Sequence, residues 1–558
     1  MCAVTMLASG ARARAADARA GLATPVVDVA SPTPAPAAAG GTTGAMPSAG
    51  TGVATPAAPD PSRSSSGASA WRGDCPASLG GPAEDGPPVY EDDPVVAPRK
   101  KAWEDAFGGQ EAARPHIQAR LRGWPSRVLT APLDLPAGPR ELLERVARDT
   151  WRGLDALSDR ENGLPIDHLR LRGRSTDLGE VEIGDYANVT NVGLYLIDLV
   201  AARDLRLIAP EEAQARAALI LDTLDRLETW QGYPYNYYDT TSLERTSNFL
   251  SFVDVAWLVA GLIATRGAMP DLADRASEWI DRLDLGFFYD AERGQMSHGY
   301  FTHRRARSRY HYGVFYTEAR LGVLLAIGQG RVPADAWFRM VRVFPPACTA
   351  QTLVPSNVRT ALVGGRDVLT GWYEWKGLRY VPSWGGSMFE ALMPLLVLDE
   401  LRLAPKSLGA NDLVHATVQQ RYAAEELGYP VWGMSPCARP RGGPYGEFGV
   451  RVLGSRGYPA GAVTPHATAL AAAVAPDRAA EGLRALAERF PVYGEYGFYD
   501  AVEPTSGKVA TELLALDQSM LFIALANHLT GGALRDRFAA DPIVQRAAPV
   551  LSAESFFE

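Results

Sequence analysis

The stretch His311-Tyr-Gly-Val-Phe-Tyr-Thr-Glu-Ala-Arg-Leu321 leads into a long apolar segment and places one carboxylate, Glu318, among aromatic residues such as Tyr312. Apolar spacing predicts a helix over 316–329, and a negative charge in its first turn complements the helix dipole. Glu318 is therefore either a helix-cap charge or an acid whose pKa is raised by desolvation toward that of a general acid. Arg320 is either its orienting partner or a surface charge.

Similar helical spacing recurs in about a dozen blocks. The blocks are 138–158, 190–206, 210–230, 251–266, 268–284, 316–329, 333–343, 386–403, 410–427, 465–475, 477–489 and 512–530. The best strand candidates are Lys376–Val381 and Phe448–Leu453. No fixed-period repeat is visible, which argues against an α-solenoid. The pattern predicts an all-α fold in which six helical hairpins close into an (α/α)6 barrel with a few short strands.

Composition divides the chain into four regions. Residues 1–16 have a short apolar run and an Ala-x-Ala pattern but no basic start, so they are either a truncated signal segment or a plain disordered start. Residues 17–95 are rich in Ala, Pro, Gly and Ser and predict a disordered linker. Residues 96–137 form a peripheral arm, and residues 138–558 form the compact domain. A signal segment would place the protein in the periplasm or outside the cell.

Bulk properties exclude several classes of partner. The formal net charge is −9 and there is no Lys/Arg block, so neither nucleic acid nor an anionic membrane is an expected partner. No apolar run is long enough for a transmembrane segment. The cysteines lack metal-ligand spacing, so no metal site is expected. The sequence leaves a Cys348–Cys437 disulfide open beside the simpler interpretation of small buried thiols.

Two acids upstream of Glu318 also lie beside aromatic rings. Asp254 interrupts the apolar run 249–262, and Trp257 follows it at helical spacing. Because an isolated buried charge is very costly, Asp254 is either a structural hydrogen-bonding acid or a substrate ligand. Asp239 ends Tyr235-Asn-Tyr-Tyr-Asp239, which includes Tyr237, and is either the acid of an Asx turn or cap or a further site residue.

Two more acids follow downstream. Glu390 closes Trp384-Gly-Gly-Ser-Met-Phe-Glu390, where glycines let the backbone approach a ligand and a capping box with Ser387 is the competing interpretation. Asp500 ends Tyr496-Gly-Phe-Tyr-Asp500. Glycosidic cleavage needs two acids, one to protonate the leaving oxygen and one to activate water or attack. Acids among aromatics predict a cleft for an oligo- or polysaccharide, with Glu318 and Asp500 as the first candidates for this pair.

Ten segments in order resemble the glycoamylase-like domain family, which contains endo-β-1,2-glucanases and the cyclising domain of cyclic β-1,2-glucan synthases. They are Gly163–Asp167, Thr190–Tyr195, Tyr235–Asp239, Phe252–Asp254, Thr317–Arg320, Val332–Pro333 with Trp337–Phe338, Ser383–Pro394, Val431–Ser435, Thr464–Leu470 and Tyr496–Ala501. The resemblance implies an (α/α)6 barrel and no metal or organic cofactor. It also implies that Glu318 is an essential catalytic carboxylate, that Asp254 is an acid of the substrate site, and that Trp384, Trp432 and Tyr499 line the cleft.

One departure from the family narrows the expected chemistry. The cyclising, retaining branch has a second catalytic Glu in Trp-Gly-Ile-Ser-Glu-Ser, whereas this chain reads Trp432-Gly-Met-Ser-Pro-Cys437. Proline cannot act as a nucleophile. The hydrolase branch also lacks that Glu and carries an Asp and an Asp-Gln pair, which are matched here by Asp500 and by Asp517-Gln518.

We therefore expect an inverting glycoside hydrolase of a β-linked glucan, with β-1,2-glucan favoured. Glu318 would be its general acid, and Asp500 or Asp254 would help to activate water. The alternative, motivated by Pro436, is a non-catalytic glycan-binding or scaffold protein of a polysaccharide synthesis or export system.

Overall fold

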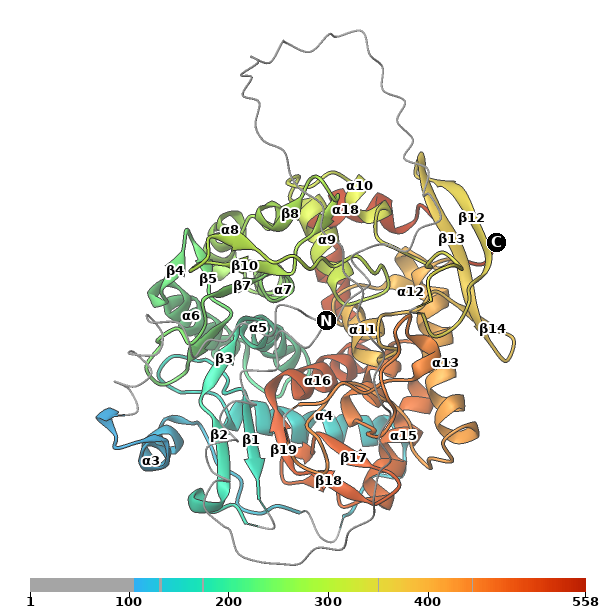
Figure 1. Ribbon diagram of the computed structural model, residues 1–558. Coiled ribbons are helices and arrows are strands. Elements are labelled where there is room, and N and C mark those ends of the chain that lie inside the picture. Colours follow the sequence, from blue (N-terminus) through green and yellow to red (C-terminus); the bar gives the residue numbers. More distant parts are fainter. Residues whose placement is uncertain (1–104, 130–132, 173–174, 350, 444) are drawn as a thin grey trace, which may run out of the picture.

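The computed structural model describes residues 105–129, 133–172, 175–349, 351–443 and 445–558 (Figure 1). The predicted segments 1–16 and 17–95 lie outside the described residues. The predicted arm, 96–137, contains helix α3 (Gln110–Arg120), whose apolar side chains Ala113 and Ile117 are buried in the main core. The arm is thus attached to the compact part of the chain.

Helices account for most of the regular structure. They are α4 (Pro139–Ala156), α5 (Val189–Asp204), α6 (Pro210–Arg226), α7 (Phe252–Ala268), α8 (Ala273–Arg282), α9 (Ala319–Gly328), α10 (Asp335–Phe338), α11 (Met388–Leu392), α12 (Glu400–Leu403), α13 (Leu408–Glu425), α14 (Pro465–Leu470), α15 (Pro476–Arg489), α16 (Ala515–Leu529), α17 (Ala533–Ala539) and α18 (Pro542–Leu551). Each predicted block contains a helix, and α3, α17 and α18 were not predicted. Block 386–403 is divided by a 3-10 turn, Met393–Leu396, in which Pro394 lacks a backbone N–H.

The helices differ in how they meet the core. Helices α5, α7, α9 and α16 are apolar almost all round and buried, whereas α4, α6, α8 and α15 have one apolar face. Helix α7 packs between α5 and α9, and α16 packs between α5 and α14. Helices α6, α8, α18, α13 and α15 pack against α5, α7, α9, α11 and α14, respectively. Figure 1 shows α6, α8, α13 and α15 toward the outside of the molecule.

Short strands lie between the helices. They are β1 (His168–Leu171), β2 (Val181–Gly184), β3 (Tyr186–Asn188), β4 (Thr229–Trp230), β5 (Tyr233–Pro234), β6 (Tyr237–Asp239), β7 (Phe249–Ser251), β8 (Tyr289–Asp290), β9 (Gln295–Met296), β10 (Gly299–Phe301), β11 (Ala306–Arg307), β12 (Ser356–Val363), β13 (Arg366–Trp375), β14 (Leu378–Tyr380), β15 (Tyr493–Gly494), β16 (Gly497–Phe498), β17 (Ala501–Glu503), β18 (Lys508–Ala510) and β19 (Glu512–Leu514). All their pairings are antiparallel, and the sheet that reaches the site has the order β19-β1-β2.

One strand prediction is confirmed and one is wrong. Segment 376–381 contains β14, whereas 448–453 forms a loop that ends in the 3-10 turn Arg451–Leu453. This loop lies against the backbone of Gly385 and Gly386, where a side chain on Gly449 or on the following Gly454 would collide with it.

The sequence left a Cys348–Cys437 disulfide open, and the structure does not contain that pair. Cys348 is disulfide-bonded, whereas Cys437 is a free, buried thiol, so a Cys348–Cys437 bond is excluded. Cys437 fits the simpler interpretation of a small buried residue.

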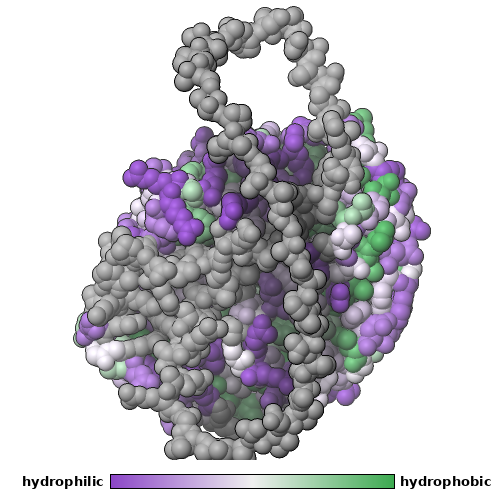
Figure 2. Space-filling view, viewed as in Figure 1, coloured by the Kyte–Doolittle hydropathy of each residue, from purple (hydrophilic) through white to green (hydrophobic). Residues whose placement is uncertain are grey.

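The visible surface is mostly hydrophilic, with apolar side chains gathered along the right-hand edge near hairpin β12–β13 (Figure 2). On this hairpin Leu362 is 75% exposed, and Val354 just before it is 68% exposed. Within the described ranges, no helix has the length and apolar character needed to cross a membrane.

Candidate active site

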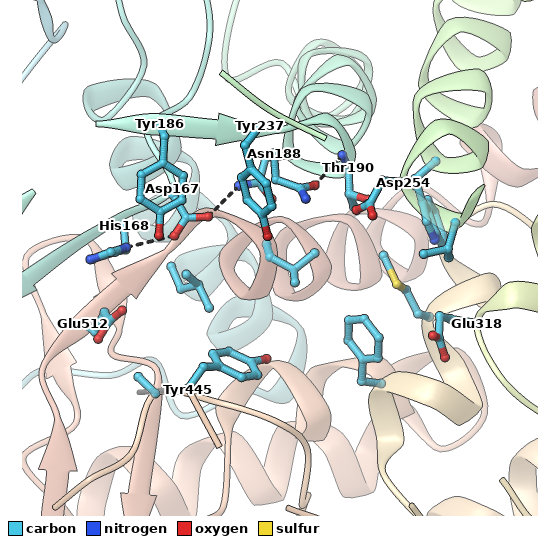
Figure 3. A pocket seen from close by; sticks show the side chains of 18 of the residues that line it. Asp167, His168, Tyr186, Asn188, Thr190, Tyr237, Asp254, Glu318, Tyr445 and Glu512 are labelled. Carbon is cyan, nitrogen blue, oxygen red and sulfur yellow. Dashed lines mark hydrogen bonds and ion pairs between the residues drawn. The ribbon is translucent and has the colours of Figure 1, made fainter. Parts of the chain in front are cut away.

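A pocket opens among the ends of the helices and the β19-β1-β2 sheet (Figure 3). Five residues singled out in the sequence line it: Tyr237, Asp254, Trp257, Tyr312 and Glu318. They come from β6, from α7 and from the segment before α9. The structure thus brings together aromatic rings and two carboxylates from segments that are far apart in the sequence.

Glu318 lies at the N-cap position of α9, which begins at Ala319 rather than at 316. Before this helix, the hydroxyl of Tyr316 donates a hydrogen bond to Asp412 on α13. The Glu318 side chain makes no capping hydrogen bond and is 3% exposed, and its Oε2 has no hydrogen-bond partner among the described residues. Burial, and after it the nearby Glu390 carboxylate, raise the pKa of Glu318 to about 7. A carboxyl with this pKa can deliver a proton near neutral pH.

Asp254 is the second buried carboxylate at this end of the pocket (Figure 3). It lies in the first turn of α7, where its N–H bonds the N-cap hydroxyl of Ser251. Its Oδ1 accepts a hydrogen bond of 2.6 Å from the hydroxyl of Thr190, and its Oδ2 has no partner in the described part of the chain. Burial raises the pKa of Asp254. One oxygen is therefore fixed by the protein and the other is free for a ligand or water.

The opposite end of the pocket is polar and was missed in the sequence. Asp167 accepts hydrogen bonds from His168 Nδ1 at 2.9 Å and from Asn191 Nδ2 at 3.3 Å. Burial disfavours a charged imidazole, but Glu512, Asp167 and Glu182 outweigh burial and raise the pKa of His168 to about 10. This end therefore holds an imidazolium among carboxylates.

Strand pairing builds this polar end. Strand β1 presents Arg170 between its two neighbours, where Nε lies 2.6 Å from Glu512 on β19 and Nη1 lies 2.9 Å from Glu182 on β2. The residues of the pocket that sequence reasoning did not assign to it include Asp167, His168, Arg170, Tyr186, Asn188, Thr190, Asn191, Tyr445 and Glu512. Three of these residues lie in segments 163–167 and 190–195. Both segments resemble the family, and this resemblance could have pointed to the polar end of the pocket.

Arg320 has a different role from the expected ones. It is fully buried, so it is not a surface charge, and it does not line the pocket. Its Nε and Nη2 lie 2.8 and 2.7 Å from the two oxygens of Glu400, and Nη2 also donates to the carbonyl of Ala391 on α11. Arg320 therefore joins α9 to α11 and α12, and it bonds Glu400 rather than Glu318.

Glu390 and Asp239 are both held by local hydrogen bonds and lie outside the pocket lining. Glu390 forms the capping box with Ser387 and also accepts hydrogen bonds from Ser383 and from the backbone of Gly385. Asp239 Oδ1 accepts from the two backbone N–H groups of Thr241 and Ser242. The competing interpretations, a capping box and an Asx turn, describe these contacts.

Trp384, Trp432 and Tyr499 also lie outside the lining of this pocket. Trp384 packs against the small cluster that contains Cys348, and Trp432 is buried in the main core. The hydroxyl of Tyr499 donates to the carbonyl of Val128. These three residues were expected to line a glucan cleft, and they do not line this pocket.

Asp500 lies behind the pocket wall. Its Oδ2 accepts a hydrogen bond of 2.5 Å from the backbone N–H of Ala438, and Ala438 itself lines the pocket. Burial raises the pKa of Asp500 to about 7. Of the three carboxylates considered for catalysis, Glu318 and Asp254 reach the pocket, whereas Asp500 is separated from it by this segment.

Two family models match parts of the chain. Residues 354–542 match the Glycoamylase model, described as "Putative glucoamylase", and residues 145–305 match a model described as "Protein of unknown function (DUF3131)". The chain resembles the glycoamylase-like family. The glycoamylase-like match contains Asp500 and the other match contains Asp254, whereas Glu318 lies between them.

A curated relative supports the same resemblance. The chain is 23% identical over 560 residues to the cyclic beta-(1,2)-glucan synthase NdvB of Rhizobium meliloti. The alignment covers 74% of this chain, and it spans only 18% of the length of that relative.

Solved structures of endo-beta-1,2-glucanases share the fold. An endo-beta-1,2-glucanase from Chitinophaga pinensis, in complex with sophorotriose and glucose, superposes with a TM-score of 0.61 at 15% identity, over 75% of this chain and 99% of that one. An endo-beta-1,2-glucanase from Talaromyces funiculosus with sophorose gives 0.54 at 13% identity, over 74% and 90%. At these identities the likeness establishes the fold alone.

Proposed function

We propose that this protein is a glycoside hydrolase that cleaves a β-linked glucan, with β-1,2-glucan favoured and inversion at the anomeric carbon. The observation that carries the proposal is Glu318, a buried carboxyl with an unpartnered oxygen that faces a pocket lined by aromatic rings. Its pKa of about 7 suits a general acid. The glucanases of similar fold supply the choice of linkage.

In this mechanism Glu318 donates its proton to the glycosidic oxygen as the bond from that oxygen to the anomeric carbon breaks. Asp254 accepts a proton from a water molecule whose oxygen attacks the anomeric carbon from the opposite face. Thr190 holds one oxygen of Asp254 and leaves the other for the water. Asp500, the other candidate for this step, would need the segment of Ala438 to move before it could reach the water.

The rest of the pocket would bind sugar rings. Trp257, Tyr312 and Tyr237 offer aromatic faces, which suit the apolar faces of glucose units. Asp167, Asn191 and other polar groups of the far end would bind hydroxyl groups. We expect a chain of sugars to lie along the pocket with the scissile bond near Glu318.

The same proposal includes the architecture and the location. Helices α5, α7, α9, α11, α14 and α16 would form the inner ring of an (α/α)6 barrel, with α6, α8, α18, α13, α15 and α4 outside. The packing pairs and the Arg320 bond from α9 to α11 support this closure. Residues 138–558 would form one catalytic domain. The disulfide at Cys348 supports a periplasmic or secreted location, because disulfides persist in oxidising compartments.

Glu318→Gln tests the proposal, because the amide keeps the shape and cannot donate the proton. The release of reducing ends from linear β-1,2-glucan should fall by roughly two to four orders of magnitude. NMR of the first products should show the α-anomer if the wild type inverts. Glu481→Gln, on the exposed side of α15, is the control and should keep wild-type activity.

Two results would contradict this function. Wild-type turnover by a folded Glu318→Gln variant would show that Glu318 is not the general acid. Saturable binding of the glucan without new reducing ends in the wild type would instead favour the non-catalytic, glycan-binding alternative that Pro436 motivates.

A further inference from the structure

Three buried side chains converge behind the pocket wall. They are His466 at the start of α14, Asp500 between β16 and β17, and Asp517 in the first turn of α16. One nitrogen or oxygen atom from each lies within 4.8 Å of the others. The three residues are at most 2% exposed.

The atoms that face one another form no hydrogen bond, although His466 Nδ1 lies 3.3 Å from Asp517 Oδ2. His466 Nδ1, Asp500 Oδ1 and both carboxylate oxygens of Asp517 have no hydrogen-bond partner in the described part of the chain. No Lys or Arg among the described residues forms an ion pair with Asp500 or Asp517. Two buried carboxylates side by side are costly when both are ionised, so either a shared proton or a bound cation lies between them.

The remaining polar atoms of His466 and Asp500 contact residues outside the cluster. The Nε2 of His466 lies 3.4 Å from the hydroxyl of Thr464, and donation from Nε2 would turn the lone pair of Nδ1 toward the carboxylates. The backbone N–H of Ala438 fixes the other oxygen of Asp500 at 2.5 Å. Outer contacts of this kind orient the side chains that bind metal ions.

We propose that His466, Asp500 and Asp517 bind a divalent transition-metal ion such as Zn²⁺ or Mn²⁺. One imidazole nitrogen and carboxylate oxygens are donors that such ions accept, and the two positive charges balance the two carboxylates. The resemblance to the glycoamylase-like family implies no metal, so the proposal rests on the arrangement of these three side chains alone. The ion would tie α14 and α16 to the Ala438 segment and thereby hold the pocket wall in place.

The full-length protein tests this site directly. After dialysis against metal-free buffer, with ZnCl₂ or MnCl₂ then added and excess removed by gel filtration, mass spectrometry should find one metal ion per chain. Asp517→Asn and His466→Gln should each lose the bound ion, with the Kd for Zn²⁺ or Mn²⁺ raised by about 100-fold or more in calorimetric titrations. Adding the ion should raise the unfolding midpoint of the wild type and of neither variant.

Two controls make the result specific. Asp198→Asn removes another buried carboxylate, which bonds Ser519 of α16 and lies outside the cluster, and it should leave binding of the ion unchanged. Glu318→Gln should bind the ion normally, so a failure of the glucanase proposal and a failure of the metal site are distinguishable.

The site is overturned if the wild type takes up neither Zn²⁺ nor Mn²⁺ at millimolar concentration. In that case Asp500 and Asp517 would share a proton instead. Equal metal content in the wild type and in Asp517→Asn would also overturn it, because the ion would then be held elsewhere.

Discussion

At the scale of single residues, the protonation state of Glu318 is the variable that sets activity. Burial and Glu390 raise its pKa to about 7, above the ordinary value for a glutamate. A general acid must carry its proton, so kcat/KM should fall as the pH rises through about 7. A pH profile of kcat/KM on β-1,2-glucan, which reports the free enzyme, should show this alkaline limb, and an activity that stays level to pH 9 would contradict it.

Substitution of Glu390 should shift the alkaline limb of the pH profile. Its negative charge disfavours ionisation of Glu318, so Glu390→Gln should shift the alkaline limb to lower pH. The glutamine can still accept the hydrogen bonds that Ser383 and Gly385 donate to Glu390. Asp198→Asn, a buried change elsewhere, should leave the limb in place. A limb at the same pH in both variants would show that Glu390 does not act on Glu318.

At the scale of elements, the contact between α5 and α7 positions much of the pocket. The two helices approach so closely that a Cβ on Gly193 would lie 2.3 Å from the carbonyl oxygen of Trp257, and one on Gly261 would lie 2.2 Å from that of Gly193. Gly261→Ala should therefore cost about 1–3 kcal/mol of unfolding free energy in urea titrations, because neither backbone can move away freely. It should also lower activity, since α7 carries Asp254.

Gly267 in the same helix is the matched control. A Cβ there would meet the Cβ of Arg537 at 3.8 Å, an ordinary contact. Gly267→Ala should be neutral or slightly stabilising, because alanine favours a helix over glycine. Equal destabilisation by both substitutions would mean that the close approach of α5 and α7 does not limit side-chain size.

Much of this level of structure could be predicted from the sequence, because helical spacing marks each long inner helix. Helix α18 was missed, since Pro549 interrupts its short apolar pattern. The polar end of the pocket was missed for a different reason. Strand β1 has four residues, and its partner β19 lies near the other end of the chain, so no local pattern joins His168 to Glu512.

Side-chain roles were harder to predict than helices. Glu318 and Asp254 could be placed in one site because both stand beside aromatic residues in apolar segments. The same rule selected Asp500, which lies behind Ala438. Arg320 was considered because it is close to Glu318 in the sequence, and it bonds Glu400. The local sequence shows which residues are neighbours along the chain. The direction in which a side chain points depends on tertiary packing.

At the scale of the whole molecule, one hydrophobic core runs from Ala113 to Phe556. The two family-model matches, 145–305 and 354–542, suggest two units along the chain. The packing argues otherwise, because α16 from the second match lies against α4 and α5 from the first. We therefore expect the helical body to unfold as one unit.

Calorimetry of the full-length protein should accordingly show a single transition for the helical body. A fragment that ends at residue 349 should lack fixed tertiary structure by near-ultraviolet circular dichroism, because the faces of α4 and α5 that α16 covers would be exposed to water. Adding the complementary fragment, 351–558, should restore the near-ultraviolet signal, since the same apolar faces can then be buried between the two chains. Two separate transitions, or a folded fragment ending at 349, would mean that the two matched regions are independent domains and that the shared core adds little to the cohesion of the molecule.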